Sequence, residues 1–102
     1  MSNLHGAEVL TQLRQESDKP ILIKFTAPHC PSCETLAPIL DELKRDRPDD
    51  FELVSIDMTE DVEAAIEFKV RSAPTVVLLK GNEVKEKVAG LKPKKFYQDL
   101  IS

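Results

Sequence analysis

The chain has 102 residues, a length typical of one domain, and we expect residues 1–102 to form a single one. Hydrophobic residues make up 41% of the sequence and charged residues 31%, a balance that permits a packed core and argues against disorder. The formal net charge of −4 gives no electrostatic reason to expect nucleic acid or an anionic membrane as a partner.

No apolar run approaches the length of about 20 residues needed to span a bilayer. Residues 1–6 lack the basic start and the apolar stretch of a secretory signal, so we expect a cytoplasmic protein. We also expect it to be a monomer. No residue pattern indicates a cofactor or a resident metal ion. Basic residues do gather late in the chain, but acidic residues interleave with them, which favours a solvated face over a phosphate-binding site. These basic residues are Lys80, Lys85, Lys87, Lys92, Lys94 and Lys95.

The first part of the chain predicts a helix, a strand and a second helix. Apolar residues at helical spacing indicate a helix over residues 7–15. Residues 21–26 are apolar at nearly every position and rich in β-branched and aromatic side chains, which is typical of a strand covered on both faces. Lys24 is the exception in that strand. Leucine and isoleucine then recur at helical spacing over residues 31–45, where Pro38 is expected to kink the helix.

The middle of the chain predicts a second strand over residues 51–57, followed by a helix. Thr59 is a plausible N-cap of that helix, because acidic residues follow it in the first turn. The apolar side of the helix is expected to consist of Ala65, Ile66, Phe68 and Val70.

A hairpin and a last helix complete the pattern. Residues 75–80 are the most strand-like run, and residues 81–82 make a two-residue turn to an alternating, half-exposed strand over residues 83–89. Residues 92–93 then open a helix. This order favours an α/β fold with a mixed sheet and helices on both of its faces. Three phenylalanines are expected in the core: Phe25, Phe68 and Phe96.

The two cysteines, Cys30 and Cys33, stand where the first predicted strand gives way to a helix. The loop between them is too small to constrain much chain, so the pair indicates redox chemistry more than a structural staple. Unpaired N–H groups and the dipole at a helix N-terminus favour the thiolate that Cys30 needs as a nucleophile. Pro31 suits the first helical turn. Cys33 lies about one turn later on the same side and is the expected resolving thiol.

Two other interpretations of the cysteine pair stay open at this point. The thiols could be inert and structural. They could also form half of a metal site shared with a second chain, although only His5 and His29 could add ligands.

Further matches along the chain make the sequence resemble the thioredoxin family. They occur in the family's order and at its spacing, from about Pro20 to the C-terminus. They are FTAPHCPSC (residues 25–33), APILDEL (37–43), ID (56–57), VRSAPT (70–75) and LKGNEV (79–84). The resemblance implies the thioredoxin fold, with a mixed central sheet of about four strands, helices on both faces, and Pro74 as a cis-proline facing the dithiol. The family's first strand is expected to be short or absent, because residues 2–6 have little strand character.

The resemblance also implies a function, thiol–disulfide exchange with protein disulfides. A thioredoxin-reductase-like protein or another thiol donor would recharge the dithiol. In this family an extended client segment pairs with backbone beside the cis-proline, which makes Ala73, Pro74 and Thr75 the expected substrate-binding rim. A plain strand-start proline is the alternative for Pro74. The alternative functions are a non-catalytic binding module that uses the groove beside Pro74 and a glutathione-linked, glutaredoxin-like activity.

Several residues at the site depart from a typical thioredoxin. They are His29 in place of tryptophan, Pro31 and Ser32 in place of Gly-Pro, and Lys24 in place of a buried aspartate. When protonated, His29 could stabilise the Cys30 thiolate and make the site more oxidising. The alternative is that His29 is an exposed residue that only covers the motif. Lys24 could favour the Cys33 thiolate by its charge, reach past the core to solvent, or act as a base when neutral and desolvated.

Overall fold

One mixed β-sheet runs through the part of the chain that the computed structural model describes, residues 6–102. Its four strands lie in the order β2-β1-β3-β4. They are β1 (Ile21–Thr26), β2 (Glu52–Asp57), β3 (Thr75–Lys80) and β4 (Glu83–Ala89). β1 pairs with β2 in parallel and with β3 antiparallel, and β4 is antiparallel to β3. The mixed sheet expected from the sequence is therefore confirmed. The expectation about a first strand concerned residues 2–6, of which residues 2–5 lie outside the described range and Gly6 begins a helix.

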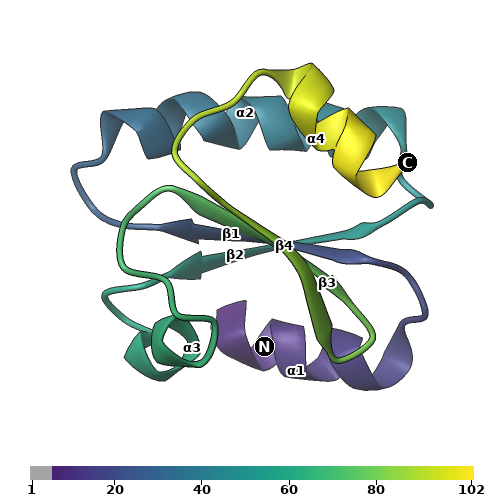
Figure 1. The fold of residues 1–102 in the computed structure, drawn as a ribbon, viewed down its shortest axis with the longest axis horizontal. Coiled ribbons are helices and arrows are strands. Elements are labelled where there is room, and N and C mark those ends of the chain that lie inside the picture. Colours follow the sequence, from purple (N-terminus) through teal and green to yellow (C-terminus); the bar gives the residue numbers. More distant parts are fainter. Residues whose placement is uncertain (1–5) are drawn as a thin grey trace, which may run out of the picture.

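Helices cover both faces of this sheet (Figure 1). The helices α1 (Gly6–Glu16) and α3 (Val62–Glu67) lie on one face, and α2 (Pro31–Asp46) and α4 (Lys94–Ile101) lie on the other. Residues 21–25 of β1 are all buried, as expected for a central strand with a helical layer on each side. α2 continues through Pro38 without ending there.

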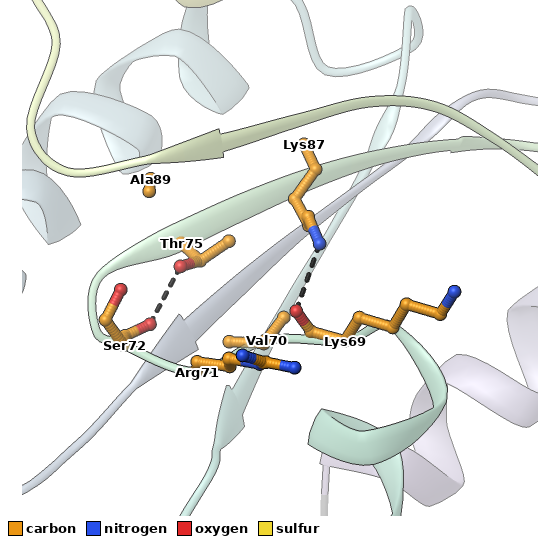
Figure 2. Close-up of a pocket in the computed structure, with 7 residues that line it drawn as sticks. All are labelled: Lys69, Val70, Arg71, Ser72, Thr75, Lys87 and Ala89. Atoms are coloured by element: carbon orange, nitrogen blue, oxygen red, sulfur yellow. Dashed lines mark hydrogen bonds between the residues drawn. The ribbon is translucent and has the colours of Figure 1, made fainter.

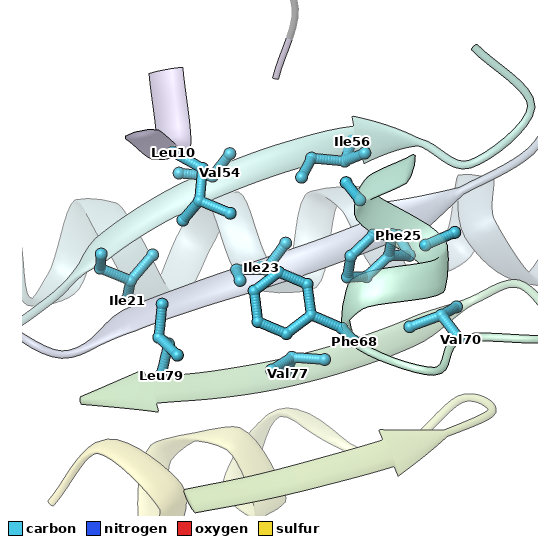
Figure 3. Packing of buried hydrophobic residues seen from close by; sticks show 12 residues of the cluster. Leu10, Ile21, Ile23, Phe25, Val54, Ile56, Phe68, Val70, Val77 and Leu79 are labelled. Carbon is cyan, nitrogen blue, oxygen red and sulfur yellow. The ribbon is translucent and has the colours of Figure 1, made fainter. Parts of the chain in front are cut away.

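Alternation along β1 divides the buried side chains into two cores. Ile21, Ile23 and Phe25 pack on the face of α1 and α3 (Figure 3), and Phe25 meets Phe68 with ring centroids 6.0 Å apart. Leu22 points to the opposite face. The core on that face also contains Leu36, Leu40, Leu43, Phe51, Val76, Leu78 and Tyr97. Because burying one large apolar side chain contributes about 1.5–3 kcal/mol, these two cores hold the helices on the sheet.

The prediction that Thr59 caps the N-terminus of α3 is wrong. The N-cap position of α3 is Asp61, and Thr59 belongs to the turn that follows β2. The hydroxyl and the backbone N–H of Thr59 donate to the carboxylate of Asp57 at 2.6 and 2.8 Å. These hydrogen bonds hold the pKa of Asp57 below its usual value. The turn thus uses Thr59 before the helix begins.

Two residues expected in the core are exposed instead. Ile66 is 69% exposed, because the short helix α3 turns Ala64 and Ala65 towards the sheet. Phe96 is 37% exposed and lies edge-on against the buried ring of Tyr97, with centroids 5.7 Å apart. In both helices the sequence contains more apolar residues than the buried face can take.

A bulge interrupts the alternation expected along β4. Leu78 lies opposite Glu86 and Leu79 opposite Val84, which leaves Lys85 without a partner in the ladder. All residues of β4 except Val88 are exposed, so this edge strand is more open than the expected half-exposed one.

Candidate active site

Cys30 caps the N-terminus of α2. Its backbone is extended (φ −119°, ψ 97°), and Pro31 fills the first helical position, where a backbone N–H would have no helical partner. The Cys30 carbonyl accepts a hydrogen bond from the Glu34 N–H at 3.1 Å, and its sulfur accepts one from the Cys33 N–H at 3.2 Å. The sulfur thus takes the place of the side-chain oxygen found at most helix N-caps.

The two cysteines are linked by a disulfide but differ in accessibility. Their Cα atoms lie 5.2 Å apart. Cys33 faces inward on α2 and is only 5% exposed, whereas Cys30 is half-buried. An incoming group therefore meets the sulfur of Cys30 first.

Strand pairing brings a second segment to the cysteines. Because β1 and β3 are antiparallel, with Phe25 opposite Thr75, the residues that follow β1 lie beside those that precede β3. The peptide bond between Ala73 and Pro74 is cis, as the resemblance implied. The carbonyl oxygen of Ala73 lies 3.7 Å from the sulfur of Cys30. Two segments more than 40 residues apart in sequence thus meet at one sulfur atom.

The turn at Pro74 is held in shape from within. The hydroxyl of Thr75 donates to the carbonyl of Ser72 at 2.7 Å, and the N–H of Gly90 donates to the carbonyl of Pro74 at 2.9 Å. Gly90 has φ 88°, in the left-handed region that favours glycine. Pro74 and Thr75 are buried, whereas Ala73 is half-buried. Of the three expected rim residues, Ala73 therefore presents the accessible backbone, and the other two shape the turn.

Sequence reasoning gave Ser72 and Gly90 no role in the site, although both support this turn. The sequence indicates their role only through the residues next to them. Ser72 directly precedes the Ala73-Pro74 step, and Gly90 directly follows a strand whose last residue, Ala89, pairs with Thr75.

The exposed tuning candidates flank the cysteines. His29 directly precedes Cys30 in the left-handed region, with φ 56°, a conformation that histidine adopts more readily than most residues. His29, Pro31 and Ser32 are all exposed. They form the solvent-facing rim around the half-buried sulfur.

Lys24 lies in the interior instead. It alternates with Ile23 and Phe25, so its side chain starts on the sheet face that α2 covers, the side on which Cys33 lies. Lys24 as a whole is only 8% exposed. Among residues 6–102 no hydrogen bond or ion pair holds its ammonium group, and no buried side-chain nitrogen or oxygen in that range lacks a partner. The ammonium group is therefore the part of Lys24 that reaches solvent.

The described residues contain neither a metal-binding cluster nor a membrane-spanning helix. Between residues 6 and 102, no three His, Cys, Asp or Glu side chains gather closely enough to hold an ion. No helix in that range is long and apolar enough to cross a bilayer.

Comparison with known proteins agrees with this geometry. The sequence model of the Thioredoxin family matches residues 3–102. The chain belongs to the thioredoxin family. The thioredoxin of Bacillus subtilis (strain 168) is 39% identical over 88 residues, which cover 86% of this chain and 85% of that protein. The chloroplastic thioredoxin M4 of Arabidopsis thaliana is 35% identical over 99 residues, which cover 97% of this chain and 51% of that protein.

A longer relative and a solved structure extend the comparison. The NADPH-dependent thioredoxin reductase 3 of Arabidopsis thaliana is 35% identical over 96 residues, 94% of this chain but 18% of that protein. The crystal structure of thioredoxin NaTrxh from Nicotiana alata matches with a TM-score of 0.82 at 28% identity, covering 93% of this chain and 81% of that one. With the thioredoxin fold and a Cys-x-x-Cys pair at disulfide distance, the chain is a thiol–disulfide oxidoreductase. Thioredoxins act with thioredoxin reductase and with protein disulfide substrates.

The burial of Lys24 leads to a stability prediction. Lys24→Met keeps an unbranched side chain and removes the need to hold an extended stem in one conformation so that its ammonium group reaches solvent, so the free energy of unfolding of the oxidised protein should rise by about 1 kcal/mol. Denaturant unfolding followed by circular dichroism measures it. The exposed Lys80→Met serves as control, with a change within about 0.5 kcal/mol. A loss of stability in Lys24→Met would show that an attractive interaction holds the ammonium group.

Proposed function

We propose that Cys30 is the nucleophile and Cys33 the resolving thiol in the reduction of protein disulfides. The Cys30 thiolate attacks one substrate sulfur, the substrate disulfide breaks, and the released substrate thiolate takes a proton from solvent. Cys33 then loses its proton to solvent and attacks the Cys30 sulfur, which frees the second substrate thiol. The substrate gains two electrons, and the protein is left with the Cys30–Cys33 disulfide.

Accessibility is the observation that carries this assignment. The nucleophile must reach a sulfur on another molecule, and Cys30 is the more exposed of the two cysteines. The resolving thiol has to reach only Cys30, which the buried Cys33 can do from one helical turn away. The start of α2 favours a thiolate at Cys30, because the Cys33 N–H donates to its sulfur and the helix presents the positive end of its dipole there.

The turn at Pro74 is the proposed substrate platform. The backbone of Ala73 lies beside the Cys30 sulfur, so a client strand paired there would carry its own cysteine to that sulfur. Pro74 and Thr75 contribute by holding the turn in this conformation. This use of the platform is compatible with catalysis, and no contact in the site favours a purely non-catalytic binding role.

A thioredoxin-reductase-like protein or another thiol donor is the proposed source of electrons. Support comes from the Arabidopsis thaliana relative that carries the words NADPH-dependent thioredoxin reductase in its name and contains a stretch similar to this chain. The monomeric state and the cytoplasmic location stay predictions from the sequence. The relatives named above include both a bacterial thioredoxin and a chloroplast protein.

Insulin reduction tests the activity. With dithiothreitol as electron donor, the wild type should precipitate the insulin B chain well above the rate of dithiothreitol alone. Cys30→Ser and Cys33→Ser should both fall to that background, because each lacks one half of the exchange cycle. Thr11→Ala, an exposed change in α1, is the control and should keep the wild-type rate. Equal background rates in wild type and both cysteine variants would contradict the proposal and favour the binding-module alternative.

The proposed role of His29 is tested by the reduction potential. Asparagine tolerates the left-handed backbone at this position and carries no charge, so His29→Asn isolates the imidazole. If a protonated His29 stabilises the Cys30 thiolate, the potential of the variant should be more negative by on the order of 10–30 mV. Equilibration with glutathione redox buffers, followed by thiol trapping, measures it. An unchanged reduction potential would show that His29 is an exposed residue that does not tune the Cys30 thiolate.

A further inference from the structure

A pocket of about 370 Å³ opens next to the turn at Pro74 (Figure 2). The side chains of Arg71 and Lys87 line it, together with the hydroxyl-bearing residues Ser72 and Thr75. Lys69 forms the remaining polar wall. The pocket therefore joins the segment before the cis-proline to the edge strand β4.

The pocket and the reactive sulfur flank the same short turn. Ser72 and Thr75 both line the pocket and are joined by the hydrogen bond from the Thr75 hydroxyl. Ala73, between them in sequence, places its carbonyl oxygen 3.7 Å from the sulfur of Cys30. A substrate segment seated on Ala73 therefore has this pocket beside it.

Among residues 6–102, the cations of the pocket have no acidic partners. Lys87 donates one hydrogen bond, 3.0 Å long, to the carbonyl of Lys69, which leaves two of its three N–H donors unused. Within residues 6–102 no carboxylate lies at ion-pair distance from Arg71 or Lys87. Other cations of the chain do have such partners: Lys85 pairs with Glu83, Lys94 with Glu42 and Asp46, and Lys95 with Asp99.

The side chains of Lys87 and Lys69 are oriented differently at the pocket. Figure 2 shows the side chain of Lys87 reaching down from β4 towards the segment that carries Arg71, while the side chain of Lys69 extends away from Ser72 and Thr75. Lys69 adopts the left-handed conformation (φ 57°) and contributes its carbonyl oxygen, which anchors Lys87. Arg71 and Lys87 thus line one pocket in a chain whose net charge is −4.

From this arrangement we propose that the pocket binds the carboxylate of an acidic side chain close to the cysteine of a protein disulfide substrate. This inference rests on the proposed function, because it concerns the substrate that Cys30 attacks. The planar guanidinium of Arg71 offers paired donors to a carboxylate, and the ammonium group of Lys87 and the hydroxyl of Ser72 offer further ones. Two cations that line one pocket without an acidic partner gain from an anion bound there, whereas a basic client would be repelled.

The expected spacing follows from strand geometry. Arg71 is two residues from Ala73, which places it at most about 7 Å away along the chain. A client strand that lies on Ala73 would carry its acidic residue one to three positions from its cysteine. The pocket would thus select among disulfides by the charge next to them and leave the exchange chemistry unchanged.

Three disulfide-bonded peptides test the proposal. They share one sequence and differ only in the two residues flanking each cysteine, which are Glu, Gln or Lys. The reduced protein is mixed with each peptide, the reaction is quenched with acid, and chromatography gives the second-order rate constant. At low salt the Glu peptide should react about three- to tenfold faster than the Gln peptide, and the Lys peptide more slowly. The ratio should approach one near 1 M salt, where the screening length is about 3 Å.

Matched variants assign the preference to the pocket. Arg71→Gln and Lys87→Gln should each lower the Glu-to-Gln rate ratio towards one, and using the ratio cancels any effect on the cysteines themselves. Lys80→Gln is the control: it removes the same charge from the far end of β3, where the side chain is exposed, and should keep the wild-type ratio.

Each remaining outcome overturns the proposal. Equal rates for the three peptides would show that the pocket does not select clients by charge. A preference that survives in both Arg71→Gln and Lys87→Gln would locate the selection elsewhere. Oxidised glutathione serves as a fourth substrate. If its rate falls in Arg71→Gln while the Glu-to-Gln peptide ratio does not change, the pocket binds a small thiol peptide and not the side chain of a protein client. If the wild type reduces no peptide at all, the proposed exchange function fails together with the subsite, a result that differs from equal but measurable rates.

Discussion

The hydrogen bond from the Cys33 N–H to the Cys30 sulfur, at the first turn of α2, is the contact around which the site is arranged. It requires an extended Cys30 followed by a helix, and Pro31 provides a helical first turn without an unpaired N–H. The same turn directs Cys33 inward and leaves Cys30 accessible. One capping interaction therefore fixes both the positions of the two thiols and the difference in their exposure.

The sheet supplies the second half of the site. Antiparallel pairing of β1 with β3 brings Ala73 to the sulfur of Cys30, and the Gly90 N–H secures the Pro74 carbonyl from the end of β4. The order β2-β1-β3-β4 also makes β4 an edge strand, which leaves Lys87 open to solvent and to a ligand. The topology therefore explains why the reactive sulfur, the cis-proline turn and the basic pocket occupy one end of the molecule.

Much of this site could be predicted from the sequence because its determinants are local. The cysteine spacing, the proline at the helix start and the apolar run of β1 each restrict a few neighbouring residues. Ile66 and Phe96 show the limit of such reasoning, since an apolar residue does not reveal whether the sheet has room for it. The pocket lay beyond local reasoning, because Arg71 and Lys87 meet only through the pairing of β3 with β4.

Lys24 shows how a core position can depart from the family while the fold is kept. A charged side chain on the face of β1 under α2 is unfavourable unless its end reaches solvent, and its long aliphatic stem allows this. Residues 21–25 of the strand are all buried, so the sheet keeps its packing on both sides. The cost of the substitution is therefore confined to one residue and does not disturb the placement of the cysteines.

Trapping of the covalent intermediate tests the division of roles between the two cysteines most directly. In Cys33→Ser the reaction should stop after the first attack, so a protein disulfide substrate should accumulate as a mixed disulfide with Cys30. Non-reducing electrophoresis and mass mapping of the linked peptides identify the bond. Cys30→Ser should trap little or no substrate, since Cys33 is only 5% exposed. Equal trapping through Cys33 in Cys30→Ser, or none through Cys30, would contradict the account.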